Sequence, residues 1–341
     1  MNDSNKVTVI AEAGVNHNGN IEMAIDLIEA AVDAGADIIK FQTFNPDKIV
    51  TKYSKKAEYQ IRNFSNKENE DQYTMLKKLQ LSYKEHKLLI NKCKKSNIEF
   101  LSTGFDLESL ELLNSLDLKR YKIPSGEITN LPYLRKIAQF NKPIILSTGM
   151  ADILEIEASL NIFMERGFSS KDITLLQCTT EYPAPIDEIN LKVINFFKNK
   201  FKVNVGLSDH SEGIEVPIAA VALGVNIIEK HITLDRNLTG PDHNASLEPK
   251  EFKQMVQGIR KITRALGEEK KIITESEFKN KDLIRKSLVA IKDIKTGDTF
   301  NSENIGCKRP GYGISPMKID KVIGLNAKKD FFVDESLSDV S

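Results

Sequence analysis

Two lysines lie inside apolar runs of this sequence, where a charged side chain is unexpected. Lys40 belongs to DIIKFQT and Lys122 to RYKIPSGE. A buried charge is costly unless it is paired or binds something, so each lysine predicts either an ion pair, for example Lys40 with Glu12, or a functional cation. Cations beside hydroxyls and backbone N–H groups suit a phosphate or carboxylate. We therefore expect a small anionic substrate, with a Schiff-base role for Lys122 as an open alternative.

Two histidines end consecutive apolar runs near the middle of the chain. His210 lies in LSDHS and His231 in EKHIT. Two imidazoles on neighbouring strands can hold a divalent ion and leave positions open for water and substrate. Such a site would suit Mn, Co, Zn or Fe without choosing among them. His17 and His243 lie in loops, where substrate contact and ordinary packing are both open, and His86 lies in a polar helical segment, where we expect it to be solvated.

The elements that must position these residues alternate regularly. Short runs rich in Val, Ile and Leu predict eight strands, and amphipathic segments such as 21–34 and 83–95 predict helices between them. This repeat predicts a (β/α)8 TIM barrel over residues 1–266, because such barrels take roughly 250 residues. A doubly wound sheet would want a Gly-rich phosphate turn after its first strand, and the chain has no GxGxxG. The predicted strands are 7–11, 37–41, 98–103, 120–124, 143–148, 173–178, 203–208 and 226–231.

Barrel enzymes carry their chemistry at the C-terminal ends of the strands. Polar side chains occur there on every predicted strand, which favours a functional site over a single buried ion pair. They are Glu12, Lys40, Gln42, Ser102, Thr103, Lys122, Ser125, Glu127, Ser147, Thr148, Gln177, Thr179, Tyr182, Ser208, His210, Glu229 and His231.

The rest of the chain differs in composition from the barrel region. Residues 267–283 are strongly charged and predict a linker or a solvated connecting helix. Residues 284–341 contain short β-like runs and turn signals at 296–298 and 309–313, which predict a small β-rich domain. Such a short domain buries only a marginal core by itself, so we expect it to pack against something else.

The overall charge excludes several classes of protein. The 341 residues carry 48 Lys+Arg and 48 Asp+Glu, whereas a nucleic-acid-binding protein usually has a basic excess. Three widely spaced cysteines give neither a disulfide framework nor a CxxC zinc site, which favours a reducing compartment. No apolar run approaches the roughly 20 residues of a membrane span, and the N-terminus does not have the pattern of a signal peptide. We expect a soluble, cytoplasmic protein with no nucleic-acid or membrane partner.

Ten segments, in order along nearly the whole chain, resemble the sialic acid synthase family. They are AEAGVNHNG (11–19), IKFQTF (39–44), LSTGF (101–105), YKIPSGEITNLPYL (121–134), IILSTGM (144–150), CTTEYPAP (178–185), GLSDHS (206–211), EKHITLD (229–235), GPDHNAS (240–246) and KRPGYGISP (308–316). The last one resembles the antifreeze-like (SAF, β-clip) domain that follows the barrel in that family. Gly104, Thr180 and Tyr312 depart from the pattern, which bears mainly on the identity of the sugar.

The resemblance implies a role for each matched residue. His210 and His231 resemble the metal ligands, usually of Mn2+, with Mg2+ or Co2+ as alternatives. Glu127 resembles an acid/base near the reacting carbon. Arg309 resembles an arginine that the antifreeze-like domain inserts into the partner subunit's site of a homodimer, where it holds the sugar's N-acetyl group. The other matched residues resemble a phosphoenolpyruvate pocket (Lys40, Thr103, Lys122, Ser125, Ser147, Ser208) and sugar contacts (Glu12, Gln42, Tyr182, Asp242). We expect Thr180 to bind substrate as well, although its residue type departs from the pattern.

The implied reaction is attack of C3 of phosphoenolpyruvate on a metal-polarised open-chain aldehyde, addition of water to C2, and loss of phosphate by C–O cleavage. We expect N-acetylmannosamine as the aldose and N-acetylneuraminate as the product. One alternative is a legionaminic acid synthase that uses 2,4-diacetamido-2,4,6-trideoxymannose. A synthase for a sugar phosphate would need more basic residues at the site. A non-catalytic sugar-binding barrel would bind without turnover.

Overall fold

The computed structural model describes residues 6–51, 54–63 and 71–338. The chain divides into two compact units, Met1–Gly267 and Glu268–Ser341, which we describe separately. Among the described residues, no helix is long and apolar enough to cross a membrane. The first residues of the chain, on which part of the signal-peptide prediction rests, lie outside the described residues.

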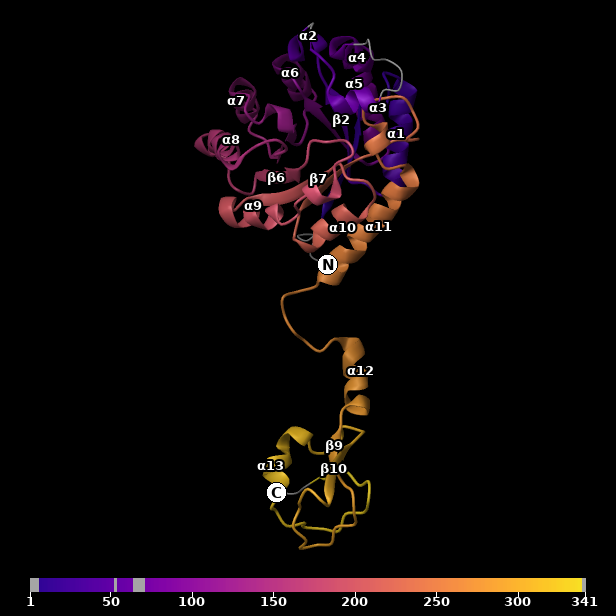
Figure 1. Cartoon of the computed structure of the whole chain (residues 1–341), viewed down its shortest axis with the longest axis vertical. Helices are drawn as coiled ribbons and strands as arrows, with labels where there is room; N and C mark the ends of the chain where they lie inside the picture. Colours follow the sequence, from indigo (N-terminus) through magenta and orange to yellow (C-terminus); the bar gives the residue numbers. More distant parts are fainter. Residues whose placement is uncertain (1–5, 52–53, 64–70, 339–341) are drawn as a thin grey trace. The chain divides into compact units, whose positions relative to one another are not determined.

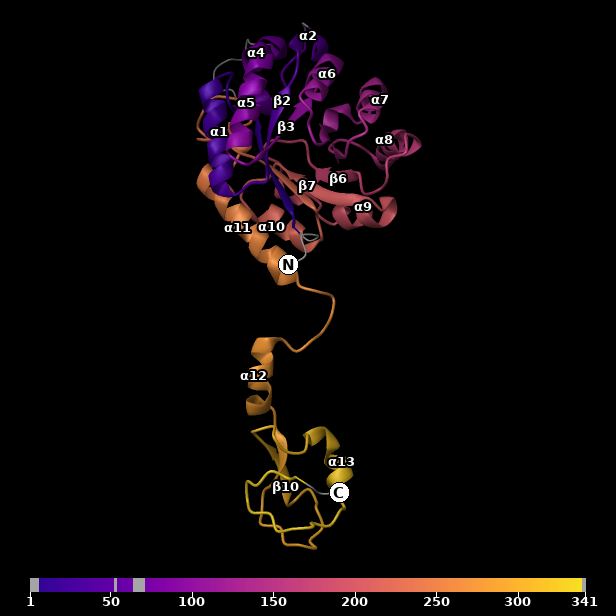
Figure 2. The same ribbon diagram turned by 180° about the vertical axis from the view of Figure 1, so that it is seen from behind.

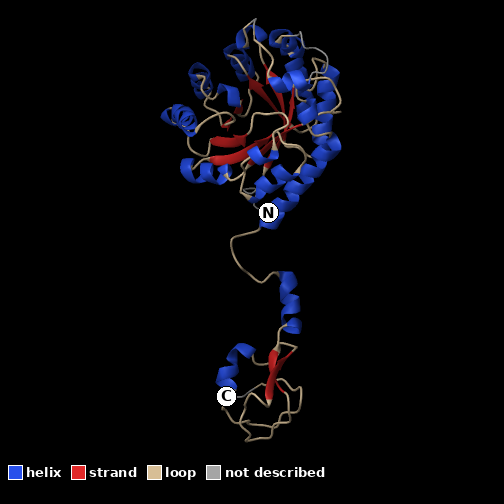
Figure 3. Ribbon diagram, viewed as in Figure 1, coloured by secondary structure: helices blue, strands red, loops and turns tan. Residues whose placement is uncertain are grey.

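The first unit is a (β/α)8 barrel, as the sequence predicts. Its eight parallel strands pair in the order β3-β2-β1-β8-β7-β6-β5-β4, and β3 also lies beside β4, so the sheet is nearly closed. A ring of helices surrounds the strands (Figures 1 and 3). The strands are β1 Thr8–Gly14, β2 Ile38–Thr43, β3 Glu99–Gly104, β4 Tyr121–Ile123, β5 Ile144–Ser147, β6 Ile173–Cys178, β7 Asn204–Asp209 and β8 Ile227–His231.

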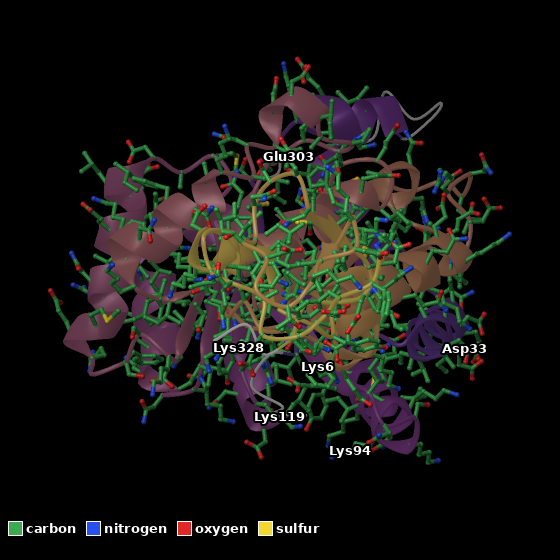
Figure 4. All side chains as sticks on the ribbon, turned by 90° about the horizontal axis from the view of Figure 1, so that it is seen from below. Lys6, Asp33, Lys94, Lys119, Glu303 and Lys328 are labelled. Atoms are coloured by element: carbon green, nitrogen blue, oxygen red, sulfur yellow. The ribbon has the colours of Figure 1, made fainter. Side chains whose placement is uncertain are left out.

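Each strand is followed by a helix that packs its apolar face on the barrel. These helices are α1 Ile21–Ala34, α5 Tyr83–Lys95, α6 Leu107–Ser115, α7 Leu131–Gln139, α8 Ile153–Glu165, α9 Val193–Phe201, α10 Glu215–Ala222 and α11 Pro249–Leu266. Local signals fix several of their ends. The side chain of Asn20 caps the start of α1, and Ser82 and Glu85 form a capping box on α5. Charged side chains such as Asp33 and Lys94 are exposed on these outer helices (Figure 4).

The connection between β2 and α5 is much longer than the two to six residues usual after a barrel strand. Its described part contains three short helices, α2 Pro46–Ile49, α3 Glu58–Asn63 and α4 Gln72–Leu79, of which α2 and α4 lie at the same end of the unit as α6 (Figures 1 and 2). Long connections in compact domains are usually functional. We call this connection, residues 44–82, the β2–α5 segment.

The second unit has a small core of its own. Strands β9 Ser287–Ala290 and β10 Ile305–Lys308 pair antiparallel, and isolated bridges join Ile294 to Phe331 and Thr299 to Asn326. Leu288, Phe300 and Phe331 are buried in its centre. Before this core, α12 Glu275–Ile284 buries none of its residues. Whether the small domain packs against another surface stays a prediction.

Candidate active site

A cavity of about 480 Å3 lies at the C-terminal ends of the barrel strands. Four of the predicted strand-end side chains, Ser102, Thr148, Gln177 and Thr179, do not line it and instead hydrogen-bond to neighbouring parts of the barrel. The fourteen barrel residues with an expected role in the site all line it, and they come from all eight strands and the loops after them. They are Glu12, Lys40, Gln42, Thr103, Lys122, Ser125, Glu127, Ser147, Thr180, Tyr182, Ser208, His210, His231 and Asp242. The remaining candidate, Arg309, follows β10 in the second unit, where its side chain is exposed.

Four buried charged residues form the polar floor of the cavity, and we call them the charge cluster: Glu12, Lys40, Lys122 and Glu229. Lys40 Nζ lies 2.7 Å from Glu12 Oε2 and donates to Thr103 Oγ1 at 3.1 Å. Lys122 Nζ donates to Ser147 Oγ at 2.7 Å. Glu229 lies 3.7 Å from each lysine Nζ, which is an ion-pair distance but too long for a good hydrogen bond.

Burial and charge act against each other within this cluster. Burial raises the pKa of Glu12 above its ordinary value although Lys40 opposes the shift. Burial favours a low pKa for Lys40, but the carboxylates of Glu12 and Glu229 outweigh it and raise that pKa. Burial also lowers the pKa of Lys122, against the opposing effect of Glu229. Both lysines line the cavity and share Glu229 at 3.7 Å, so their Nζ groups are placed to contact an anion there.

The hydroxyls of Ser125 and Thr180 lie where β4, β5 and β6 end. Ser125 Oγ accepts from the backbone N–H of Gly149 at 3.0 Å, and Thr180 Oγ1 is buried without a hydrogen-bond partner. A Cβ at Gly149 would lie 2.1 Å from Thr180 Oγ1 and 2.9 Å from Ser125 Oγ. Only glycine therefore lets the loop after β5 approach both hydroxyls.

His210 and His231 face each other across the ends of β7 and β8, with ring centroids 5.4 Å apart. His210 Nδ1 lies 2.7 Å from the carbonyl oxygen of Thr179. Because a carbonyl only accepts, Nδ1 carries the hydrogen and Nε2 is left as the ligand nitrogen. His231 Nδ1 is buried without a hydrogen-bond partner, 3.9 Å from Asp242 Oδ2, and burial together with His210 holds the pKa of His231 well below its usual range.

This donor set fits a divalent ion held by two imidazole nitrogens. Burial favours a low pKa for His210, but Cys178 and the Thr179 carbonyl outweigh it and raise that pKa. A bound ion would therefore displace a proton more readily from the ring of His231 than from that of His210. Among residues 6–51, 54–63 and 71–338, no group of three or more His, Cys, Asp or Glu side chains is placed to hold a metal. The protein would therefore supply two ligands, and water and substrate would supply the others. The Tyr182 ring lies against both histidines, with its centroid 4.0 Å from His210 and 5.7 Å from His231.

Comparison with known proteins assigns the chain to a family. Residues 27–271 match the NeuB family, and residues 285–340 match the SAF domain. The chain belongs to the NeuB family. Synthases of this family are phosphoenolpyruvate-dependent condensing enzymes, so the chain is an enzyme of that transferase type. The expected resemblance and the barrel-plus-SAF architecture are thereby confirmed.

Two relatives share one name. N,N'-diacetyllegionaminic acid synthase from Campylobacter jejuni is 54% identical over 97% of this chain and 98% of its own length. The protein of that name from Legionella pneumophila is 45% identical over 93% of this chain and 89% of its own. A solved structure of N-acetylneuraminic acid synthetase from Leptospira borgpetersenii has 36% identity and a TM-score of 0.70, covering 81% of this chain and 90% of its own.

Two buried polar residues near this NeuB-type site were not assigned correctly from the sequence. The strand-end position of Glu229 predicts no particular role for it, yet it contacts both lysines. Alternation along β8 places Ile227, Glu229 and His231 on one side of the strand, which is the signal that could have identified it.

The prediction that His86 is solvated was wrong. His86 is fully buried, with Nδ1 2.8 Å from the Ser82 carbonyl oxygen and Nε2 2.7 Å from Thr43 Oγ1. It supports the end of β2 from outside the cavity. His17 and His243 are also buried and are not among the residues that line the cavity, so packing describes them better than substrate contact.

Proposed function

We propose that this enzyme condenses phosphoenolpyruvate with 2,4-diacetamido-2,4,6-trideoxymannose and water to give N,N'-diacetyllegionaminic acid and phosphate. The observation that carries this choice is the 54% identity, over nearly the full length of both chains, to a protein with that name. N-acetylmannosamine, the aldose first expected from the sequence, has weaker support, since the sialic acid synthetase above is 36% identical. The alternative therefore replaces it as the main proposal.

The charge cluster and the neighbouring hydroxyls are our proposed phosphoenolpyruvate pocket. Lys40 and Lys122 supply fixed cations for the carboxylate and phosphate groups, and Thr103, Ser125, Ser147 and Ser208 supply hydroxyls beside them. Both lysines are almost wholly buried, with side chains 4% and 3% exposed, so their charges act in a medium that screens them little. Fixed donors of this kind stabilise charge that develops on phosphate during C–O cleavage.

We propose His210 and His231 as ligands of a divalent metal, with Mn2+ as the first choice and Mg2+ or Co2+ as alternatives. Bound there, the ion would act as a Lewis acid toward the aldehyde oxygen. His210→Ala or His231→Ala should abolish turnover and weaken Mn2+ binding, measured by electron paramagnetic resonance of free Mn2+. Unchanged Mn2+ affinity in both variants would exclude the two-histidine site.

The remaining candidates are proposed contacts to the sugar and to transferred protons. Gln42 Nε2 lies 3.3 Å from Glu12 Oε1, which places an amide and a carboxyl together at one side of the cavity. Tyr182 and Asp242 line the cavity near the histidines. Thr180 lines it beside Ser125 and Gly149. Glu127 is half-buried, and burial raises its pKa although Asn130 donates to it at 2.6 Å. A raised carboxyl pKa suits a group that delivers a proton to a new alkoxide.

Arg309 is a proposed contact to the sugar's N-acetyl group in the site of a second copy of the chain. Its exposure on the SAF unit leaves it available for such a contact, and the resemblance to the family supports it. Subunits carrying His210→Ala, mixed with subunits carrying Arg309→Ala, should recover part of the activity that each loses alone. No recovery in verified mixed dimers would mean that each site is built from one chain.

Phosphate release tests the proposed function. The assay contains phosphoenolpyruvate, Mn2+ and one of three aldoses: the trideoxy diacetamido sugar, N-acetylmannosamine or arabinose 5-phosphate. We expect the highest kcat/KM with the trideoxy sugar. A higher value with N-acetylmannosamine would restore the first expectation from the sequence. Absence of release with every aldose would exclude the synthase proposal.

A further inference from the structure

A second hydrophobic cluster, separate from the barrel core, forms one wall of the cavity. We call it the apolar wall. It consists of Val15 after β1, Phe105 after β3, and side chains of the β2–α5 segment: Phe44, Ile49, Met75, Leu76 and Leu79. All of its members line the cavity. Phe44 and Phe105 meet edge to face, with ring centroids 6.4 Å apart, which joins the parts contributed by different loops.

In its described part, the β2–α5 segment lines the cavity mainly with apolar side chains. Asp47, which does not line the cavity, is held by two neighbours in the segment: Lys77 Nζ lies 3.0 Å from its Oδ2, and Tyr73 donates to its Oδ1 at 2.6 Å. The described side chains of this segment that line the cavity are apolar except for two uncharged amides, Gln60 and Gln72. The described part of the segment therefore presents an almost entirely apolar face to a site whose floor is charged.

An apolar wall is a poor match for a ligand that carries hydroxyl groups along its whole length, because a hydroxyl buried there has no hydrogen-bond partner. In the proposed complex, the carboxylate and phosphate of phosphoenolpyruvate bind at Lys40 and Lys122. The apolar wall is then left to contact the sugar. A hydroxyl held against Ile49, Met75 or Leu76 would lose its water partners without gaining a protein partner. A methyl group there would instead be removed from water favourably.

We propose that the apolar wall determines sugar specificity by receiving the deoxygenated C6 end of the aldose, with its methyl group. This inference rests on the proposed condensation with a deoxygenated aldose. The apolar wall would favour a sugar with a C6 methyl group over one with a C6 hydroxymethyl group. An apolar pocket separates two such substrates by at most about 100-fold in kcat/KM, because it has no buried polar group that the wrong substrate would leave unpaired.

The test compares N-acetylmannosamine with its 6-deoxy analogue, which differs only by the absence of the C6 oxygen. We expect wild-type enzyme to prefer the 6-deoxy sugar in kcat/KM by about 10- to 100-fold. Leu76→Gln and Ile49→Thr, both at partly buried positions, should reduce this ratio to near one while the KM for phosphoenolpyruvate stays unchanged. Leu76→Met should keep the wild-type ratio. Leu88→Gln, at an exposed position of α5, is the matched control.

Binding of the two corresponding alditols, measured by calorimetry, gives the same comparison without turnover. Loss of the methyl preference in Leu76→Gln and Ile49→Thr supports the wall in either assay. A preference that persists unchanged in both folded variants, or that is absent from wild-type enzyme, overturns the inference. Wild-type enzyme that binds the alditols with the expected preference but releases no phosphate would overturn only the proposed reaction.

Discussion

Strand β8 carries two adjacent buried charged residues, Glu229 in the charge cluster and Lys230 in an ion pair with Asp209 of β7, and only Glu229 lines the cavity. On the side away from the cavity, Lys230 Nζ lies 2.6 Å from Asp209 Oδ2 and also donates to the Ser211 carbonyl oxygen, and both side chains are fully buried. Asp209 Oδ1 accepts from Ser211 N at 3.0 Å and from Ser211 Oγ at 2.7 Å. We call Lys230 and Asp209 the closed pair, because close hydrogen-bond partners satisfy both charges.

The charge cluster, which Glu229 joins from the position next to Lys230 on β8, is paired differently. Glu229 is shared between Lys40 and Lys122 at 3.7 Å from each, and its other close partner is Ser208 Oγ, at 3.1 Å. The cluster also borders the cavity, whereas neither Lys230 nor Asp209 does. The difference teaches that a buried ion pair by itself says little about function. Incomplete pairing beside a cavity is what indicates a binding site for an anion.

The largest expected effect on stability belongs to the closed pair. Lys230→Met leaves Asp209 buried without its cation, and breaking a buried pair in this way costs about 3–5 kcal/mol. Urea denaturation should show this loss, and Lys253→Met at an exposed position of α11 should show almost none. Asp209→Asn together with Lys230→Met should recover at least half of the loss. Equal stabilities of wild type and Lys230→Met would contradict the structural role.

Substitution in the charge cluster should have the opposite effect: a large loss of turnover and little loss of stability. Lys122→Met should lower kcat/KM by about 10²–10³-fold, the usual loss when one group that stabilises transition-state charge is removed. Lys119→Met, with a side chain that is 74% exposed, is the matched control. If Lys122→Met unfolds as easily as Lys230→Met, or if it keeps full activity, the distinction between the charge cluster and the closed pair is wrong.

A third ion pair, at the N-terminal end of β2, should give the smallest effect. Burial opposes the charge of Asp37, but Lys6, the Val9 N–H and Arg260 outweigh it and hold the pKa of Asp37 below its ordinary 3.8. A lowered carboxyl pKa stabilises the fold above the unfolded-state value and loses that contribution as the pH falls. Asp37→Asn should therefore cost about 1–3 kcal/mol at pH 7 and progressively less below pH 3.8.

Urea denaturation at a series of pH values measures this dependence. Asp33→Asn is the control, because Asp33 is exposed on α1 (Figure 4). A difference between Asp37→Asn and wild type that stays constant from pH 7 to below pH 3.8 would show that the carboxylate charge does not contribute to it.

Periodicity predicted most of the barrel, because the eight strands and their helices are strongly patterned. The bounds of α1 and α5 match the predicted segments, whereas β4 is reduced to Tyr121–Ile123. The buried face of α5, at His86, Leu89 and Cys93, follows helical spacing, so His86 was misjudged from its polar neighbours rather than from its position.

Other features could not be predicted from the chain alone. Strand-end positions brought the fourteen barrel candidates to one cavity, but they gave no sign that Glu229 would lie between two lysines. The apolar wall depends on how α2 and α4 fold over the barrel, and short apolar runs do not predict such tertiary contacts. The role of Arg309 depends on a second copy of the chain, so it stays a proposal.

Calorimetric titration with phosphoenolpyruvate tests most directly whether the charge cluster binds an anion. The titration uses wild type, Lys122→Met and the control Lys119→Met, each with Mn2+ and without aldose. We predict that Lys122→Met loses at least about tenfold in affinity, since a charge-assisted contact is removed, and that Lys119→Met binds as wild type does. Equal affinities in all three proteins would contradict the assignment of the charge cluster as the phosphoenolpyruvate pocket.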